Sequence, residues 1–143
     1  MGNLFMKYYL FKSDPETYSF ADLEKDKKTV WDGIHNYQAI NFVKKVSPGD
    51  KIYIYHSQTD KAIVGIAEAV SEPFENKKDK RFSWAIDIKF VKWLKVPVTL
   101  AELKEHKKFE AFLLIRNGRL SVMEVPAEIH KFIESKQSRF HQT

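Results

Sequence analysis

The sequence predicts a single α+β domain organised round a small β-barrel. Expected strands of irregular length are interleaved with short helices, which is unlike the regular βαβ alternation of a parallel doubly wound sheet. The chain has 143 residues, enough for one domain to close a core without disulfides or metal. We therefore expect one domain across residues 1–143. Its tail at about 136–143 shows no periodicity and is expected to fray.

The first expected strand covers residues 6–12, where aromatic and aliphatic side chains follow one another without alternation. This composition is typical of a strand that is buried on both faces. Ser19 is followed three residues later by Asp22, which resembles a capping box and predicts a short helix. Beyond the next strand-like residues, Gly33 supplies a permissive backbone for a turn between Asp32 and Asn36.

A second helix is expected to begin after Asn36 and to run to about Val46, because asparagine is a favourable N-cap. Helical geometry places Tyr37, with Ile40 and Lys44, on the side opposite the core. Tyr37 there would either pack under a loop or offer a flat surface to a ligand. The apolar residues at helical spacing that would face the core are Ala39, Phe42, Val43 and Val46.

The middle of the chain predicts three more strands. Residues 51–57 and 62–70 form two of them, joined by a polar turn, and the first carries β-branched and aromatic residues throughout. A charged loop at 75–81 leads to a long strand at about 84–96, where apolar and charged residues alternate. That alternation predicts one buried face.

The last third of the chain begins with a second capping-box pair, Thr99 and Glu102, for a helix to about His106. A final strand is expected at 120–125. Pro126 then suits the first position of a C-terminal helix. The apolar stripe of that helix is Ile129, Phe132 and Ile133.

Composition excludes several classes of protein. The hydrophobic fraction is 43% and the aromatic fraction 14%, too high for a disordered chain, and no apolar run approaches the roughly 20 residues of a membrane helix. Cysteine is absent, which excludes disulfides and thiolate zinc sites. We expect a soluble, intracellular protein without a membrane partner, cytoplasmic or, in a eukaryote, nuclear. The net charge of +5 permits a polyanionic partner without identifying one.

The common catalytic motifs are missing. The glycines are too dispersed for a phosphate-binding loop or a dinucleotide fingerprint, and the histidines lack the spacing of a zinc hydrolase, so neither a cofactor nor a metal is expected. His56 and Ser57 look like a base and a nucleophile. Adjacent residues of a strand project to opposite faces, however, so these two cannot share a proton directly. Trp31, beside the expected turn, is either a packed anchor or a ligand wall.

Six stretches, taken together, resemble the EVE domain family in order and spacing, over about residues 6–134. They are KSDPETYS (12–19), VWDGIHNYQAIN (30–41), PGDKIYIYHS (48–57), VGIAEAV (64–70), SWAIDIKFV (83–91) and LLIRNGRLSVMEV (113–125). The resemblance implies a PUA-like fold, a mixed β-barrel decorated with short helices. It is related to the YTH domains, which hold a methylated adenine in an aromatic cage. The resemblance further implies a non-catalytic module that receives a modified base in nucleic acid, mainly DNA.

The same resemblance implies a set of base-binding residues. Trp31 matches the tryptophan of the family's W-D-G motif and would form one wall for the base. Asn36, Tyr37 and Gln38 match its N-Y-Q motif and would supply hydrogen bonds to the base edge and a second surface. The other matched positions are Lys12, Ser13, Tyr55, His56, Ser57, Trp84, Arg119 and Ser121.

Three positions depart from the family pattern. The family usually has glutamate where Asp14 stands, and often arginine where His35 and Ile40 stand. Loss of two guanidinium groups would weaken sequence-independent binding to phosphates. The partner is therefore a duplex, an extruded base or a free modified nucleoside. The basic residues that could replace the missing charge are Lys44, Lys45, Lys77, Lys78, Lys80 and Arg81.

Two other functions remain open at this stage. One is an enzyme that acts on a modified nucleoside, because PUA-like relatives of the ASCH type include amidohydrolases. Lys12, Ser13 and Glu16 would then stand for their lysine, threonine and glutamate. The other is a PUA-like module that binds RNA through its basic surface and is indifferent to base modification.

Overall fold

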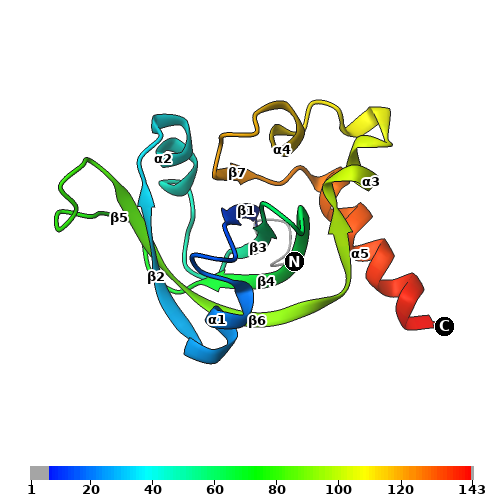
Figure 1. Ribbon diagram of the computed structural model, residues 1–143, viewed down its shortest axis with the longest axis horizontal. Helices are drawn as coiled ribbons and strands as arrows, with labels where there is room; N and C mark the ends of the chain where they lie inside the picture. The colour runs from blue at the N-terminus through cyan, green and yellow to red at the C-terminus, as the bar shows by residue number, and fades with distance from the viewer. Residues whose placement is uncertain (1–6, 143) are drawn as a thin grey trace.

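One curled mixed sheet forms the centre of the protein (Figure 1). The computed structural model describes the backbone of residues 7–142 and the side chains of residues 7–138. The strands lie in the order β2-β6-β4-β3-β1-β7, and β5 pairs with β6. β1 and β3 are parallel, whereas the other pairs are antiparallel. The strands are β1 (Tyr8–Ser13), β2 (Lys28–Ile34), β3 (Lys51–His56), β4 (Ala62–Ala69), β5 (Phe74–Glu75), β6 (Trp84–Thr99) and β7 (Val122–Glu124).

Short helices surround this sheet, so the expected α+β, PUA-like mixed β-barrel with short helices is confirmed, and its sheet is curled into a half-barrel. α2 contacts β6 and β7, and α5 lies along β6 (Figure 1). The helices are α1 (Phe20–Asp26), α2 (Tyr37–Val43), α3 (Leu100–Lys104), the 3-10 helix η2 (Lys107–Phe109), α4 (Leu113–Arg116) and α5 (Ala127–Gln142). η2 and α4 were not predicted. No helix in the described part of the chain has both the length and the apolar character needed to span a membrane.

The centre of the core is β1, which pairs with β3 on one side and β7 on the other. Tyr9, Leu10 and Phe11 are each 0% exposed. Consecutive burial of this kind is what a strand covered on both faces requires, and it confirms the prediction from the unbroken apolar run. β1 is therefore a rigid support for the residues that follow it.

Both predicted capping boxes are present. The Ser19 hydroxyl accepts a hydrogen bond from the Asp22 amide at 3.0 Å, and the Asp22 carboxylate accepts from the Ser19 amide at 2.9 Å. Thr99 and Glu102 repeat the arrangement at 3.1 and 2.8 Å. Each box satisfies two backbone N–H groups that no helical carbonyl can reach, which starts α1 and α3 at the predicted residues.

The permissive backbone expected of Gly33 is confirmed by its positive φ of 73°, although β2 continues through an irregularity after Trp31 to Ile34 before the chain leads into α2. Two predictions about α2 were wrong. α2 ends at Val43, and Ile40 is 2% exposed instead of facing solvent. Because α2 packs against both β6 and β7, it needs apolar residues on two sides.

The C-terminal segment, whose expected fraying at about 136–143 stays a prediction, is helical as far as residue 142. α5 runs on to Gln142, through residues that showed no periodicity. Two side chains attach this part of the helix to its surroundings. Lys136 pairs with Glu102, and the Gln137 amide group accepts from the Val96 N–H at 2.9 Å and donates to its carbonyl at 2.8 Å. These contacts are polar, so the helix here has no apolar stripe that would predict it from the sequence.

Candidate functional site

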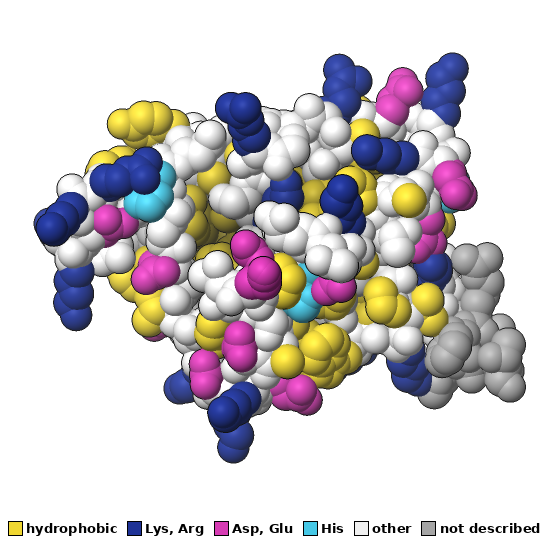
Figure 2. Space-filling view, in the orientation of Figure 1, with side chains coloured by type: hydrophobic (Ala, Val, Ile, Leu, Met, Phe, Trp, Pro, Cys, Tyr) yellow, Lys and Arg dark blue, Asp and Glu magenta, His cyan; other side chains and the backbone are white. Residues whose placement is uncertain are grey.

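A cleft of about 470 Å³ lies between the C-terminal end of β1, the segment that leads to α1, and the edge strand β2. Its volume is within the range of about 300–1,000 Å³ found for ligand pockets. Figure 2 shows a hollow with apolar side chains in its depth on this face of the molecule. The lining residues are Lys12, Ser13, Asp14, Thr17, Tyr18, Thr29, Val30, Trp31 and Asp32.

Trp31 forms the aromatic wall of the cleft. It is partly buried, and its ring centroid lies 5.8 Å from that of Phe11 and 6.1 Å from that of Tyr18. The Tyr18 hydroxyl donates to the Asp26 carboxylate at 2.8 Å, and burial is the main cause that raises the pKa of this tyrosine. Trp31 is therefore a packed residue that also lines the cleft, and its role as a ligand wall stays a prediction.

Lys12 brings a positive charge to the cleft. Its Nζ donates to the Gly118 carbonyl at 2.6 Å and lies 5.9 Å from the centre of the Tyr55 ring. Burial lowers the pKa of Lys12. Next to it, the Ser13 hydroxyl donates to the Tyr18 carbonyl. Lys12 thus connects β1 to the turn before β7, and Ser13 fixes the segment that carries Tyr18.

Three more predicted residues support the cleft without lining it. The Ser57 amide and hydroxyl both donate to the Ser13 carbonyl, at 2.9 and 3.3 Å. The Ser121 carbonyl accepts from the Lys12 amide at 2.9 Å. Tyr55 is 3% exposed under the Lys12 ammonium, and burial raises its pKa. The structure therefore brings these residues close to Lys12 and Ser13, one layer behind the cleft.

His56 belongs to the core. It is 5% exposed, and its Nε2 accepts a hydrogen bond from the Phe20 amide at 3.0 Å. Nε2 must therefore be unprotonated, so the proton is on Nδ1, which donates to Asp60 at 2.8 Å. His56 makes no hydrogen bond to Ser57, as the geometry of a strand predicted. Its role is to attach α1 to β3.

The residues of the N-Y-Q motif, Asn36, Tyr37 and Gln38, are exposed at the protein surface. The Asn36 side-chain oxygen accepts from the Ala39 amide at 3.0 Å and caps α2, so it is already occupied. Gln38 accepts from the Asn117 side chain at 3.3 Å. Tyr37 is 73% exposed and does not line the cleft.

Two predicted residues lie apart from the cleft lining. The Trp84 ring is covered by the Lys44 ammonium at 4.8 Å, and its buried Nε1 has no hydrogen-bond partner among the described residues. Arg119 is exposed, and its backbone amide donates to the Asn117 side chain at 3.3 Å. Neither the contact of Lys44 with Trp84 nor the hydrogen bond of Arg119 to Asn117 brings a side chain against Trp31.

Sequence reasoning missed several lining residues. Thr29 lies two residues before Trp31 on β2, so strand alternation could have placed both on one face. Tyr18 directly precedes the first capping box, which fixes its position at the start of α1. Val30 and Asp32 are exposed on the other face of β2 and border the cleft from its edge.

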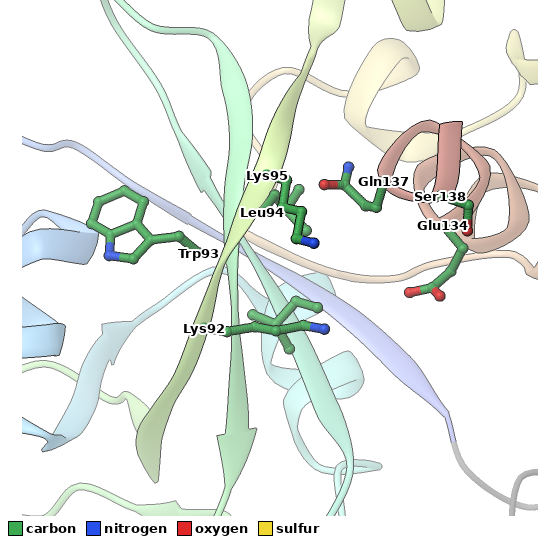
Figure 3. A pocket seen from close by; sticks show the side chains of 8 residues that line it. Lys92, Trp93, Leu94, Lys95, Glu134, Gln137 and Ser138 are labelled. Atoms are coloured by element: carbon green, nitrogen blue, oxygen red, sulfur yellow. The ribbon is translucent and has the colours of Figure 1, made fainter. Parts of the chain in front are cut away.

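Other sites offer little alternative chemistry. Within the described residues, no group of three or more histidine, aspartate or glutamate side chains is arranged to hold a metal ion. A smaller cavity of about 210 Å³ lies between β6 and α5, where Gln137 points toward the strand and Trp93 points away on the other side (Figure 3). Its Gln137 amide group is engaged by Val96. None of the predicted site residues lines this cavity.

Comparison with known proteins is consistent with this architecture. The EVE domain matches residues 7–136. Thymocyte nuclear protein 1 of Rattus norvegicus is 30% identical, across 94% of this chain and 75% of the relative. A hypothetical protein from Leishmania major has a similar structure, with a TM-score of 0.84 and 32% identity over 95% of this chain and 97% of that one.

The structure of human THYN1 protein in complex with 5-methylcytosine containing DNA is also similar. Its TM-score is 0.80 and its identity 26%, over 92% of this chain and 97% of the human one. Both the sequence match and the shared structure extend over nearly the whole described chain. The chain therefore belongs to the EVE domain family.

Proposed function

We propose that this protein is a non-catalytic module that binds nucleic acid, DNA above all, and receives a modified base in the cleft beside Trp31. The observation that carries the proposal is the human structure with 5-methylcytosine containing DNA, which matches 92% of this chain. The geometry of the cleft supports it, because a volume of about 470 Å³ beside an indole can accept a base.

The energetics of base extrusion fit such a cleft. Taking a base out of a duplex costs a few kcal/mol, and stacking on an aromatic side chain returns about 1–3 kcal/mol per base. Trp31 supplies that face. At the edge, Lys12 can donate a hydrogen bond, and the Asp32 carboxylate, which bonds to no described residue, can accept one from an exocyclic amine.

A methyl group on the base adds a modest preference. One methyl or methylene in an apolar pocket contributes about 1–3 kcal/mol, which corresponds to about 5- to 150-fold in affinity. We therefore expect the protein to prefer a methylated base without rejecting the plain one. Discrimination of this size is sufficient for a reader of base modification when modified sites are abundant.

The arrangement of Lys12, Ser13 and Glu16 favours binding over catalysis. A nucleophilic hydroxyl needs a base within hydrogen-bond reach, but the Ser13 hydroxyl donates to a backbone carbonyl instead. The Lys12 ammonium likewise donates to a carbonyl. Glu16 is exposed and does not line the cleft.

In a eukaryotic source, we predict a nuclear location, in keeping with the name of the rat relative.

Binding of short labelled oligonucleotides, measured by fluorescence anisotropy at two salt concentrations, tests the proposal. Each oligonucleotide carries 5-methylcytosine or cytosine at one position. We expect the methylated form to bind more tightly, and Trp31→Ala to weaken its binding by about 5- to 150-fold through lost stacking. Trp31→Phe keeps a smaller ring and should lose less.

Trp93→Phe is the matched control. Trp93 is 41% exposed, its Nε1 donates to Glu24 at 2.9 Å, and its ring contacts Phe20, away from the cleft. Its variant should bind as the wild type does. Equal, salt-sensitive binding of methylated and plain DNA and RNA, unchanged in Trp31→Ala, would reject the base cleft and leave a basic surface only. A product formed from modified nucleosides would instead establish the enzyme.

A further inference from the structure

Large apolar side chains are exposed next to the cleft, on the outer side of β2. Val30 is 51% exposed, and it borders both the base cleft and a wider cavity of about 860 Å³. Phe74 on β5 is 39% exposed and lines the same wider cavity. Clustered exposed apolar groups of this kind mark interaction surfaces more often than isolated ones do.

Tyr37 and Phe82 are the most prominent part of this surface. They are 73% and 48% exposed, and their ring centroids lie 6.0 Å apart at an interplanar angle of 31°. Tyr37 begins α2, whereas Phe82 lies near the end of the loop between β5 and β6. Two rings held side by side in solvent add little to the core, but they offer flat apolar faces to a partner.

The loop that carries Phe82 is held in place by Asp79. Its carboxylate accepts from the Ser83 hydroxyl at 2.7 Å and from the Arg81 amide at 3.0 Å, and it contacts His35 Nε2 at 2.9 Å. These partners, Ser83 first, lower the pKa of Asp79 to about 2. Because His35 is two residues before Tyr37, Asp79 also fixes the loop beside the start of α2.

The same loop is strongly basic. Figure 2 shows Lys and Arg side chains gathered at the left edge of the molecule, over β5 and the loop that follows it in Figure 1. None of these residues makes an ion pair within the described part of the chain, so their charges are available to phosphates. They are Lys77, Lys78, Lys80 and Arg81.

Two sets of contacts relate the aromatic pair and its loop to the base cleft. On one side, Gln38 next to Tyr37 bonds to Asn117, and the following residue, Gly118, accepts from Lys12 in the cleft. On the other side, Val30 and Asp32 border the base cleft and the wider cavity alike, and Lys77 and Lys78 line the latter. The base cleft and the basic loop therefore adjoin at Val30 and Asp32. The aromatic pair lies on that loop and on α2, the helix that follows β2.

We propose that Tyr37 and Phe82 form an aromatic wedge that enters a DNA duplex beside the extruded base and fills the gap it leaves, while loop 76–83 contacts the flanking phosphates. This rests on the function proposed above and names its partner as duplex DNA. Apolar wedges that enter base steps are a general means of opening a duplex, and stacking on the wedge offsets part of the cost of extrusion. The wedge is not needed for a free nucleoside or a single strand.

Affinities for two ligands test the wedge. One is a duplex with a single paired 5-methylcytosine, and the other is the same strand without its complement. We expect Tyr37→Ala and Phe82→Ala each to weaken duplex binding by about 5- to 150-fold and to leave single-strand binding within about twofold. Trp31→Ala should weaken both ligands, because the base enters the cleft in each case. Both wedge residues are largely exposed, so their variants should fold normally.

Salt dependence tests the phosphate contacts separately. Replacing Lys77 and Lys78 by alanine should reduce the slope of log K against log salt by about 2, since each lost phosphate contact removes about 0.9. An unchanged slope would overturn the role of these two lysines. Trp93→Phe serves again as the control outside the surface.

The outcomes separate this proposal from the one on which it rests. Equal loss for duplex and single strand in Tyr37→Ala and Phe82→Ala, or loss for neither, overturns the wedge. If the wild type still prefers 5-methylcytosine and its binding depends on Trp31, the proposal of a base cleft is retained without the wedge. If the wild type shows no such preference and Trp31→Ala has no effect, the base cleft itself fails, and the wedge fails with it.

Discussion

Gly65→Ala should disrupt the contact between β4 and α1. A Cβ at this position would lie 2.0, 2.4 and 2.6 Å from three carbon atoms of the Phe20 ring, well inside van der Waals contact. The ring is buried and has aromatic neighbours. Phe20 is 1% exposed, and its centroid lies 4.9 Å from that of Phe90 and 4.8 Å from that of Trp93.

The expected loss of stability in Gly65→Ala has two parts. Forcing an extra carbon into a packed core costs about 1–3 kcal/mol. If Phe20 moves, its amide also loses the hydrogen bond to His56, and a buried donor left unsatisfied costs about 1–3 kcal/mol more. Together these reduce the free energy of unfolding by about 2–6 kcal/mol, a large share of the about 5–15 kcal/mol of an ordinary domain. Because Tyr18 precedes α1, binding in the cleft should weaken as well.

Urea unfolding followed by circular dichroism measures this loss, with Gly118→Ala as the matched control. A Cβ on Gly118 would meet nothing within 4 Å, and its φ is not positive, so a change within about 0.5 kcal/mol is expected. Phe20→Leu in the Gly65→Ala background should recover part of the stability. If Gly65→Ala loses no more than Gly118→Ala, the packing argument is refuted. Strict additivity with Phe20→Leu would show that the ring is not the cause.

Three further predictions concern pH and caps. Burial lowers the pKa of His130, whose Nδ1 bonds to the Tyr53 hydroxyl at 2.7 Å, so the unfolded state binds more protons as pH falls through about 6.5. Stability in urea should therefore decline with acidification around that value, and less so in His130→Phe; an identical decline would contradict the assignment. For Asp79, whose pKa is about 2, the contribution of the carboxylate is present above its ordinary value of 3.8 and lost as pH falls through about 2. Asp79→Ala should speed hydrogen exchange at the Arg81 amide at neutral pH, and unchanged exchange would mean that the loop is held by other contacts. Ser19→Ala removes the cap of α1 and should lower the free energy of unfolding by about 0.5–2 kcal/mol in urea, with a change near zero excluding a stabilising cap.

The sequence predicts the structure best where it depends on residues that are close together in the chain. The capping boxes at Ser19 and Thr99 involve residues three apart, so their hydrogen bonds can form in any chain that begins a helix there. The unbroken apolar run of β1 likewise reports its own burial. Local chemistry of this kind is visible without knowledge of the partner strands.

The sequence predicts less of the structure where contacts with distant parts of the chain determine burial or helix length. Ile40 is buried only because α2 meets two strands at once, and the shape of the sheet sets that arrangement. Gln137 in α5 bonds to Val96, 41 residues away, a contact that no local pattern predicts. Within the site, the motifs identified Lys12, Ser13 and Trp31 in the cleft, but they could not show that Asn36 uses its side-chain oxygen as a cap.

His35 and Ile40, where the resemblance to the family led us to expect arginine, lie in different surroundings in this chain. Ile40 is 2% exposed and packs in the core. His35 lies 2.9 Å from the Asp79 carboxylate and is therefore directed at the loop, not at solvent. That loop carries basic residues at 77, 78, 80 and 81. The His35 contact thus adds to those of the Ser83 hydroxyl and the Arg81 amide in holding the basic loop. Under the wedge proposal, the His35→Ala variant should lose duplex affinity through the loop, while its affinity for the single strand is unchanged.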